Sequence, residues 1–231
     1  MENSDTKVPD FAALLAAGRP ILIDGGLATQ CEAMGCNIDG NLWSGVLLRD
    51  DPRSIVAANR AYLDAGARIV TTASYQASRH GFMQEGSSAS EADRLIQSSV
   101  TLARQARDEF VRDNPRAATP LIAASIGPYG AVLHDGSEYT GDYDISAEEL
   151  RQFHLERLAL LDTGDIDLLA CETIPNAVEA LVLSELLRDA KNSSWISFSC
   201  RDSMHLADGT PLAEAAGLFA EHPRVLAVGV N

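Results

Sequence analysis

The chain has 231 residues, of which 46% are hydrophobic and 22% are charged, and its formal net charge at pH 7 is −15. That negative balance excludes nucleic acids and anionic membrane surfaces as expected partners. No run reaches about 18 consecutive apolar residues, which excludes a predicted membrane span. The negative charge would not repel a cationic small molecule.

The first strand is predicted at residues 21–23, where Ile-Leu-Ile runs into Asp24-Gly25-Gly26. A short apolar run that stops at such a turn is typical of a buried parallel strand. Parallel α/β folds place their chemistry at the carboxyl ends of the strands, so Asp24 is a candidate pocket residue. The alternative is that its carboxylate only caps the turn. A short amphipathic helix is expected before this strand, at Phe11 to Ala17, and an irregular segment after it, at residues 30–51.

Strands and helices then alternate to the end of the chain. Further strands are expected at 69–72, 120–126, 166–170, 195–200 and 225–230, and helices at 52–65, 90–114, 146–162, 176–190 and 211–221. Ser90 is the expected cap of the second helix, and Ser146 with Glu149 forms a capping-box pattern. Strict alternation predicts a parallel sheet with right-handed crossovers. Because no G-x-G-x-x-G fingerprint is present, we expect a (β/α)8 barrel of the TIM type rather than a dinucleotide-binding sheet.

Only about six βα units of that barrel are expected in this chain. We predict one barrel domain over residues 20–231, preceded by a polar segment and a short helix over residues 1–19. A (β/α)8 barrel needs eight strands, so the chain is expected to hold an incomplete barrel. The first and sixth strands would then have unpaired edges, from which we expect poor solubility.

The residues at the strand ends resemble those of one enzyme family. They are Asp24-Gly25-Gly26, Thr-Ala-Ser-Tyr-Gln-Ala at 72–77, Ser-Ile-Gly-Pro-Tyr-Gly at 125–130, Cys-Glu-Thr-Ile-Pro at 171–175 and Val-Gly-Val-Asn at 228–231. In this order they resemble the homocysteine S-methyltransferase family, particularly the branch that uses S-methylmethionine or S-adenosylmethionine as methyl donor. The resemblance covers residues 20–231. It implies transfer of a methyl group to the homocysteine thiol, which gives methionine.

The resemblance also implies a zinc ion held by three cysteines. One would directly follow a Gly-Val-Asn-like strand end and two would be adjacent in a late Gly-Gly-Cys-Cys motif, so all three are expected beyond Asn231. We therefore identify no metal ligand and no catalytic residue in this chain. A free thiol has a pKa of about 8.5, and zinc coordination deprotonates it. Without those ligands we expect neither tight zinc binding nor methyl transfer.

The resemblance implies that Asp24 and Glu172 bind the amine of homocysteine. A pair of partly buried carboxylates facing an ammonium group is a charge-assisted arrangement. A salt bridge at the start of a helix or in a loop stays open as the alternative role of Glu172. The backbone N–H groups of Leu27 and Ala28, freed by the Gly25-Gly26 turn, are expected to hold the substrate carboxylate.

An aromatic residue and two glycines are further candidates for the pocket. Tyr75 could wall the pocket with its ring against a sulfonium, or it could only pack at the rim. The glycines at 25 and 26 could allow close approach of the substrate, or they could only satisfy the turn. The residues with weaker claims, expected to be structural, are Ser125, Tyr129 and Ser199.

The cysteines and the N-terminus indicate the compartment. The four cysteines form no C-x-x-C pair, and neither they nor the five histidines show the spacing of a metal site, so reduced thiols are expected. Residues 1–7 lack the apolar core of a signal peptide, so we expect a cytoplasmic protein.

Two other classes of function stay open. One is a barrel lyase or aldolase that uses Asp24 and Glu172 as acid, base or divalent-metal ligands. The other is a non-catalytic remnant that binds an amino acid, or a partner chain through its open sheet edge. The sequence indicates neither the methyl donor nor the oligomeric state.

Overall fold

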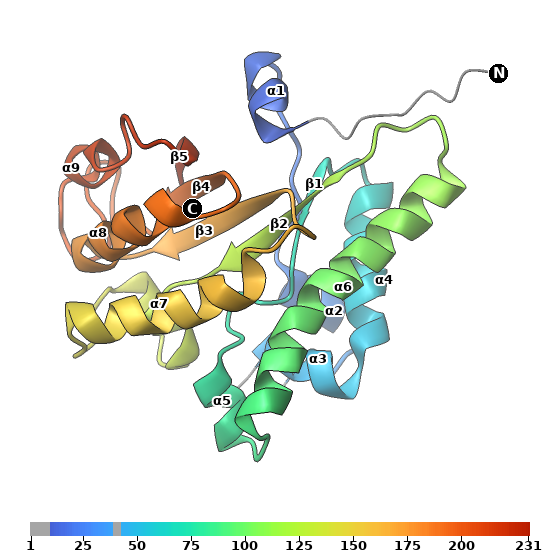
Figure 1. The fold of residues 1–231 in the computed structure, drawn as a ribbon, viewed down its shortest axis with the longest axis horizontal. Helices are drawn as coiled ribbons and strands as arrows, with labels where there is room; N and C mark the ends of the chain where they lie inside the picture. The colour runs from blue at the N-terminus through green and yellow to red at the C-terminus, as the bar shows by residue number, and fades with distance from the viewer. Residues whose placement is uncertain (1–9, 39–42) are drawn as a thin grey trace.

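The computed structural model describes residues 10–38 and 43–231. The predicted polar segment at residues 1–7 lies outside this part. The strands form one parallel sheet in the order β1-β2-β3-β4-β5, so each strand pairs with the next one in the chain (Figure 1). The strands are β1 (Ile69–Thr71), β2 (Leu121–Ile126), β3 (Leu168–Ile174), β4 (Ser194–Phe198) and β5 (Val225–Val230).

The predicted α/β class with a parallel sheet is confirmed. A strand order without reversal is the order found around a TIM barrel, whereas a doubly wound sheet reverses its order at a switch point. In the part of the chain that the structure describes, the sheet has five strands and closure into a barrel is not seen.

The predicted first strand is wrong in extent. Residues 21–23 contribute one parallel bridge, between Ile23 and Ile69, in place of a sixth strand. Two hydrogen bonds flank this bridge, from Arg68 N to the Leu22 carbonyl at 2.8 Å and from Asp24 N to the Ile69 carbonyl at 3.1 Å. Leu22 and Ile23 remain 61% and 52% exposed, so this run lacks the burial that would extend it into a strand.

Strand β3, which corresponds to the strand predicted at residues 166–170, runs further than predicted. β3 continues through Glu172, so this residue lies within a strand rather than after it. The pairing with β4 shifts register between Cys171 and Ile174, and Thr173 has a φ of 63°. The polar residues at this irregularity explain why the apolar run on its own ended too early at residue 170.

Most of the helices lie on the outer side of the sheet, whereas the first one, α1, covers the other face. The helices are α1 (Phe11–Ala16), α2 (Leu27–Ala33), α3 (Leu47–Asp50), α4 (Pro52–Asp64), α5 (Arg79–Gln84), α6 (Ala89–Asp113), α7 (Ala147–Leu161), α8 (Ala177–Leu186) and α9 (Leu212–Gly217). Short 3-10 turns add η1 (Trp43–Val46), η2 (Tyr129–Val132), η3 (Ser137–Tyr139) and η4 (Leu187–Asp189). In the described chain, no helix is both long enough and apolar enough to cross a membrane.

Several helix predictions need correction. The segment 30–51 is not irregular throughout, because α2 and α3 occupy parts of it, and α5 was not predicted. The cap of α6 is Ser88, which forms a capping box with Glu91, so the predicted cap at Ser90 is wrong. Either serine satisfies the sequence pattern, and the structure selects the one whose side chain reaches the Glu91 N–H at 3.3 Å. The predicted capping box of Ser146 and Glu149 on α7 is confirmed.

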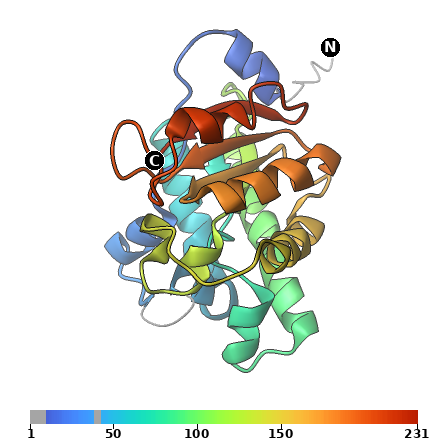
Figure 2. The same ribbon diagram turned by 90° about the vertical axis from the view of Figure 1, so that its left-hand side faces the viewer.

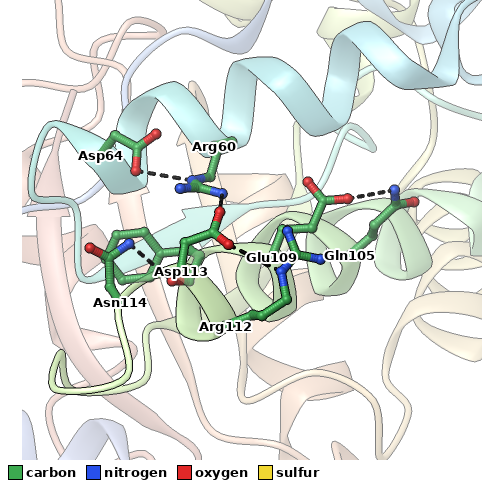
Figure 3. Close-up of polar contacts among 8 residues, drawn as sticks. Arg60, Asp64, Gln105, Glu109, Arg112, Asp113 and Asn114 are labelled. Carbon is green, nitrogen blue, oxygen red and sulfur yellow. Dashed lines mark hydrogen bonds and ion pairs between the residues drawn. The ribbon is translucent and has the colours of Figure 1, made fainter.

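Helices α4 and α6 lie side by side, and a group of charged residues joins their ends (Figure 3). Arg60 of α4 donates to Asp64 at 3.0 Å and to Asp113 of α6 at 2.7 Å. Its guanidinium carbon lies 5.8 Å from the centre of the Phe110 ring. Arg112 pairs with the same Asp113, so one surface cluster fastens the two helices together.

The two faces of the sheet are buried in different ways. One face packs against the outer helices and forms the larger core. The other face, near the amino ends of the strands, is covered by α1. Its Phe11 belongs to a buried apolar cluster with Ile69, Leu121 and Leu168, and the centre of its ring lies 5.7 Å from that of Trp195. Figures 1 and 2 show α1 at the opposite end of the molecule from α5. The carboxyl ends of the strands stay free to form a site.

Candidate functional site

A cavity of about 350 Å³ lies at the carboxyl ends of the strands. All seven residues that the sequence predicted as substrate-binding line it, together with others from four strand ends. The predicted seven are Asp24, Gly25, Gly26, Leu27, Ala28, Tyr75 and Glu172. Of the weaker candidates, Ser125 also lines the cavity, whereas Tyr129 and Ser199 do not.

Asp24 is held against the end of β1. Its Oδ2 accepts a hydrogen bond from Thr71 N at 2.6 Å and another from the Thr71 hydroxyl at 2.9 Å. Burial of the side chain is nevertheless the larger effect and raises the pKa of Asp24 to about 6. The two hydrogen bonds from Thr71 therefore fix the carboxylate in place, but they do not make up for the water that its negative charge loses on burial.

Glu172 enters the cavity from β3. Its Oε1 accepts a hydrogen bond from the Ser125 hydroxyl of β2. Burial raises the pKa of Glu172 to about 7; Asp24 raises it too, while Arg157 of α7 opposes the shift. Asp24 and Glu172 are thus coupled, and one carboxyl group disfavours ionisation of the other. A cation bound between them would favour the ionised form of both.

The Gly25-Gly26 turn leads directly into α2. Gly26 is the N-cap and has no side chain to satisfy the first N–H groups of the helix, which include those of Leu27 and Ala28. The Tyr62 hydroxyl donates to the Gly26 carbonyl at 3.0 Å, and a Cβ atom on Gly25 would lie only 3.0 Å from that same hydroxyl. The absence of a side chain at Gly25 therefore leaves room for the Tyr62 ring beside the turn.

Tyr75 follows β1 and packs against the loop after β2. A Cβ atom at Gly127 would lie 2.5 Å from the Tyr75 carbonyl oxygen and 2.7 Å from its ring, so only glycine fits there. Burial raises the pKa of the Tyr75 phenol, and the Thr173 side chain lies beside that hydroxyl. Tyr75 therefore walls the cavity as a neutral ring with little freedom to move.

Thr173 and Asn231 are among the lining residues that sequence reasoning missed. Thr173 adopts a φ of 63°, which is uncommon for a non-glycine residue. Asn231 donates from Nδ2 to the Thr173 hydroxyl at 2.6 Å, and its Oδ1 accepts from the Ser197 hydroxyl at 2.8 Å. Strained residues of this kind cluster at functional sites. No local pattern in the sequence marks the strain at Thr173.

Arg157 of α7 was also missed, and it lies beneath the cavity. The residue is 2% exposed, and its guanidinium donates to the carbonyl groups of Gly127, Ser74 and Tyr75. A signal for it existed in the sequence. Arg157 falls at the helical spacing of the buried residues Leu150, His154 and Leu161, so it occupies an apolar face.

A second buried polar group anchors the loop after β2. Glu179 of α8 accepts from Tyr129 N at 2.7 Å and from the Tyr143 hydroxyl, and it pairs with His154 Nε2 at 2.7 Å. Burial lowers the pKa of His154, the opposite direction to the effect of Glu179. Tyr129 therefore serves to hold a loop, as a structural residue.

A metal site needs several ligating side chains that lie close together. In residues 10–38 and 43–231, no three side chains of His, Cys, Asp or Glu are placed to hold a metal ion together. Burial raises the pKa of Cys31 and of Cys171 to about 12, which disfavours the thiolate that a metal needs. The residues described therefore do not fit a zinc site.

Comparisons with known proteins agree on one family. The family model described as homocysteine S-methyltransferase matches residues 21–231. The homocysteine S-methyltransferase of Escherichia coli (strain K12) is 48% identical over 221 residues, covering 95% of this chain and 71% of that protein. Homocysteine S-methyltransferase YbgG of Bacillus subtilis (strain 168) is 46% identical over 215 residues, covering 91% and 68%. The crystal structure of the homocysteine methyltransferase MmuM from Escherichia coli, metallated form, matches with a TM-score of 0.88 at 47% identity, covering 94% of this chain and 76% of that one.

Proposed function

This chain belongs to the homocysteine S-methyltransferase family, and we propose that residues 20–231 form its homocysteine-binding domain. The amino-acid end of homocysteine occupies the cavity at the carboxyl ends of the strands. The observation that carries this proposal is the coupled pair of carboxyl groups, Asp24 and Glu172, in one cavity. The lyase or aldolase alternative gains no support from the comparisons.

The ammonium group of the substrate binds between Asp24 and Glu172. Burial raises the pKa of Asp24 to about 6 and the pKa of Glu172 to about 7, so each side chain holds its negative charge poorly when the cavity is empty. An ammonium group supplies a compensating positive charge and donates charge-assisted hydrogen bonds to both carboxylates. Affinity for the ammonium is therefore expected to rise as the pH rises through 6 and 7.

The opposite end of the amino acid binds at the start of α2. The N–H groups of Leu27 and Ala28 are the first of the helix and lack intrahelical partners, so they are the proposed donors to the substrate carboxylate. Tyr75 forms the wall beside the sulfur of the substrate and of the donor. The proposed donors are S-methylmethionine and S-adenosylmethionine, whose sulfonium an aromatic face can contact.

Zinc stays a proposal that rests on resemblance to the family. A bound zinc ion would supply the homocysteine thiolate. Because the residues described do not fit a zinc site, no step is assigned to the metal and we expect no methyl transfer from these residues alone. Formation of methionine from homocysteine and S-methylmethionine by the 231-residue chain would contradict this expectation. A cytoplasmic location is proposed as well, supported by four unpaired cysteines.

Calorimetric titration with L-homocysteine tests the binding proposal. We expect saturable binding at pH 8 and at least about tenfold weaker binding to Glu172→Gln, because one of the two charged acceptors is lost. Glu148→Gln serves as control, since Glu148 is an exposed residue in the first turn of α7. Equal affinity of the Glu172→Gln variant and the unchanged protein would remove Glu172 from the amine site.

A further inference from the structure

We propose that Arg157 is a positioning residue for the substrate cavity, because its buried guanidinium joins the loops after β1 and β2 and so fixes Tyr75 on the cavity wall. This inference rests on the proposed function, since it concerns the same cavity. Arg157 lines no part of that cavity and comes from α7, on the outer side of the sheet.

The guanidinium makes three hydrogen bonds, all to backbone carbonyl groups. Nη1 donates to the Gly127 oxygen at 2.6 Å, and Nη2 donates to the Ser74 oxygen at 2.7 Å and to the Tyr75 oxygen at 2.9 Å. Ser74 and Tyr75 follow β1, whereas Gly127 follows β2. One planar group therefore fixes the spacing of two neighbouring strand-end loops.

The surroundings of this guanidinium argue for more than packing. Its carbon lies 5.2 Å from the centre of the Phe153 ring, and Nε is buried without a hydrogen-bond partner. Among the ion pairs of the described residues, none includes Arg157. Burial lowers the pKa of Arg157 to about 10, which still leaves it charged at neutral pH. A neutral side chain could also donate hydrogen bonds to these carbonyl groups, and its burial would cost less hydration free energy than that of a charged guanidinium.

The position of Tyr75 follows directly from this arrangement. The Tyr75 carbonyl is bound by Arg157 and is also the atom that would lie 2.5 Å from a Cβ atom at Gly127. Arg157 also binds the Ser74 carbonyl, so its guanidinium fixes the backbone on both sides of the Tyr75 Cα. The ring is thereby directed at the cavity by its fixed backbone, while its hydroxyl lies beside the Thr173 side chain.

The charge of Arg157 also acts on the carboxyl pair. The titratable groups that face Glu172 are Asp24 from the loop before α2, Tyr75 from the loop after β1, Cys171 from β3 and Arg157 from α7. Of these four, Arg157 alone is cationic, and it lowers the pKa of Glu172 against the effects of burial and Asp24. Loss of this charge should shift ammonium binding to higher pH.

Two substitutions separate the hydrogen bonds from the charge. Arg157→Met removes both, whereas Arg157→Lys keeps the charge but loses the planar fork that reaches three carbonyl groups. Arg60→Met is the matched control, because Arg60 also lies over a phenylalanine ring but pairs with surface carboxylates. The folding of each variant is checked by its circular dichroism and cooperative unfolding.

The first measurement is L-homocysteine binding by calorimetry from pH 5.5 to 9. We expect Arg157→Met to bind at least tenfold more weakly at pH 7, with the midpoint of its pH profile moved upward. Arg157→Lys should bind several-fold more weakly with the midpoint unchanged, and Arg60→Met should match the unchanged protein. If Arg157→Met does not fold, Arg157→Lys decides. Unchanged affinity in Arg157→Lys, or an unchanged midpoint in folded Arg157→Met, overturns the proposal.

The second measurement needs no ligand. The ring resonances of Tyr75, assigned by comparison with Tyr75→Phe, report the position of the ring in the NMR spectrum. We expect these resonances to move in Arg157→Lys and to stay in place in Arg60→Met. Unmoved Tyr75 resonances in Arg157→Lys contradict positioning, even if the unchanged protein fails to bind homocysteine. Failure of that binding by the unchanged protein contradicts the proposed function instead.

Discussion

Arg60 and Arg157 form two polar regions with the same parts and opposite surroundings. Each guanidinium lies over a phenylalanine ring, at 5.8 Å for Arg60 and 5.2 Å for Arg157. The Arg60 side chain is 23% exposed and pairs with two carboxylates, as Figure 3 shows. Arg157 is 2% exposed and binds three neutral carbonyl groups. Hydrogen bonds to carboxylates raise the pKa of Arg60, and burial lowers that of Arg157.

Arg60 makes ordinary ion pairs at the surface, whereas Arg157 is a buried charge without a carboxylate partner among the described residues. Exposed ion pairs exchange water for protein partners of similar strength and contribute little to stability. A guanidinium buried without a contacting carboxylate loses hydration and recovers only part of it through carbonyl groups. The second arrangement is stable only where the surrounding structure supports it, and here that structure is the underside of the cavity.

The largest effect is expected from Arg157→Met, which leaves three carbonyl groups without their donor. We expect the free energy of unfolding to fall by about 3 kcal/mol, at roughly 1 kcal/mol for each unpaired group. Urea denaturation measures this change. A well-packed apolar side chain can sometimes replace a buried charge at no loss, so an unchanged midpoint would show that the carbonyl groups find water or new partners.

The loop contact beside Arg157 can be disturbed without touching its charge. Gly127→Ala places a methyl group 2.5 Å from the Tyr75 carbonyl oxygen, so we expect a loss of about 2 kcal/mol from overpacking. Gly164→Ala is the control, because no atom lies within 4 Å of the added methyl group, and its effect should stay within about 0.5 kcal/mol. Equal unfolding midpoints for the two variants would contradict the close contact.

The carboxyl pair above Arg157 predicts a dependence of stability on pH. Burial raises the pKa values of Asp24 and Glu172, from 3.8 to about 6 and from 4.5 to about 7. The folded state therefore binds these protons more tightly than the unfolded chain. Their contribution to stability is greatest below pH 4 and is lost as the pH rises through 6 and 7.

Glu172→Gln removes part of that pH dependence. We expect its free energy of unfolding at pH 8 to be higher than that of the unchanged protein, by roughly 2 kcal/mol, while homocysteine affinity falls. Thermal unfolding at pH 4.5 and pH 8 measures the change, and the two proteins should differ less at the lower pH. A lower stability of Glu172→Gln at pH 8 would argue against burial as the cause of the raised pKa.

The smallest effect is expected on the surface. Arg60→Met should lower the free energy of unfolding by no more than about 1 kcal/mol, because its partners Asp64 and Asp113 regain water. Added salt should reduce the difference further by screening these exposed charges. A loss as large as that of Arg157→Met, measured by the same urea denaturation, would remove the distinction between the two regions.

Local patterns in the sequence predicted those site residues whose position depends on their neighbours in the chain. The apolar runs before Asp24 and before Glu172 predicted that both carboxylates lie in one site, and both line the cavity, although Glu172 lies within β3 and Asp24 follows a single bridge. The Ser146 capping box predicted the start of α7. Arg157 could not be assigned a role in this way, because its partners Ser74 and Gly127 lie 83 and 30 positions away. The same holds for Tyr62, whose contact with the Gly25-Gly26 turn spans 36 positions to Gly26.

The sequence predicted the fold class correctly, but it predicted the bounds of the strands and the short helices less well. The apolar runs gave the strands, but the run at 21–23 keeps too much exposed surface to form more than one bridge. β3 passes through Glu172 because its pairing with β4 resumes at Ile174, beyond the point where the apolar pattern has stopped. Helix α5 is short and contains Gly81, so its propensity is weak and its Ser78 cap is the main local signal.

The raised pKa values of Asp24 and Glu172 have a consequence for the heat of binding. With pKa values of about 6 and about 7, the pair should hold about one proton near pH 6.5, and the proposed binding of an ammonium group should displace it. The buffer must absorb that proton, so the enthalpy of homocysteine binding should vary with the ionisation enthalpy of the buffer. The slope of that variation counts the protons released. Ligand occupancy and proton occupancy of the cavity are then two measures of a single exchange equilibrium.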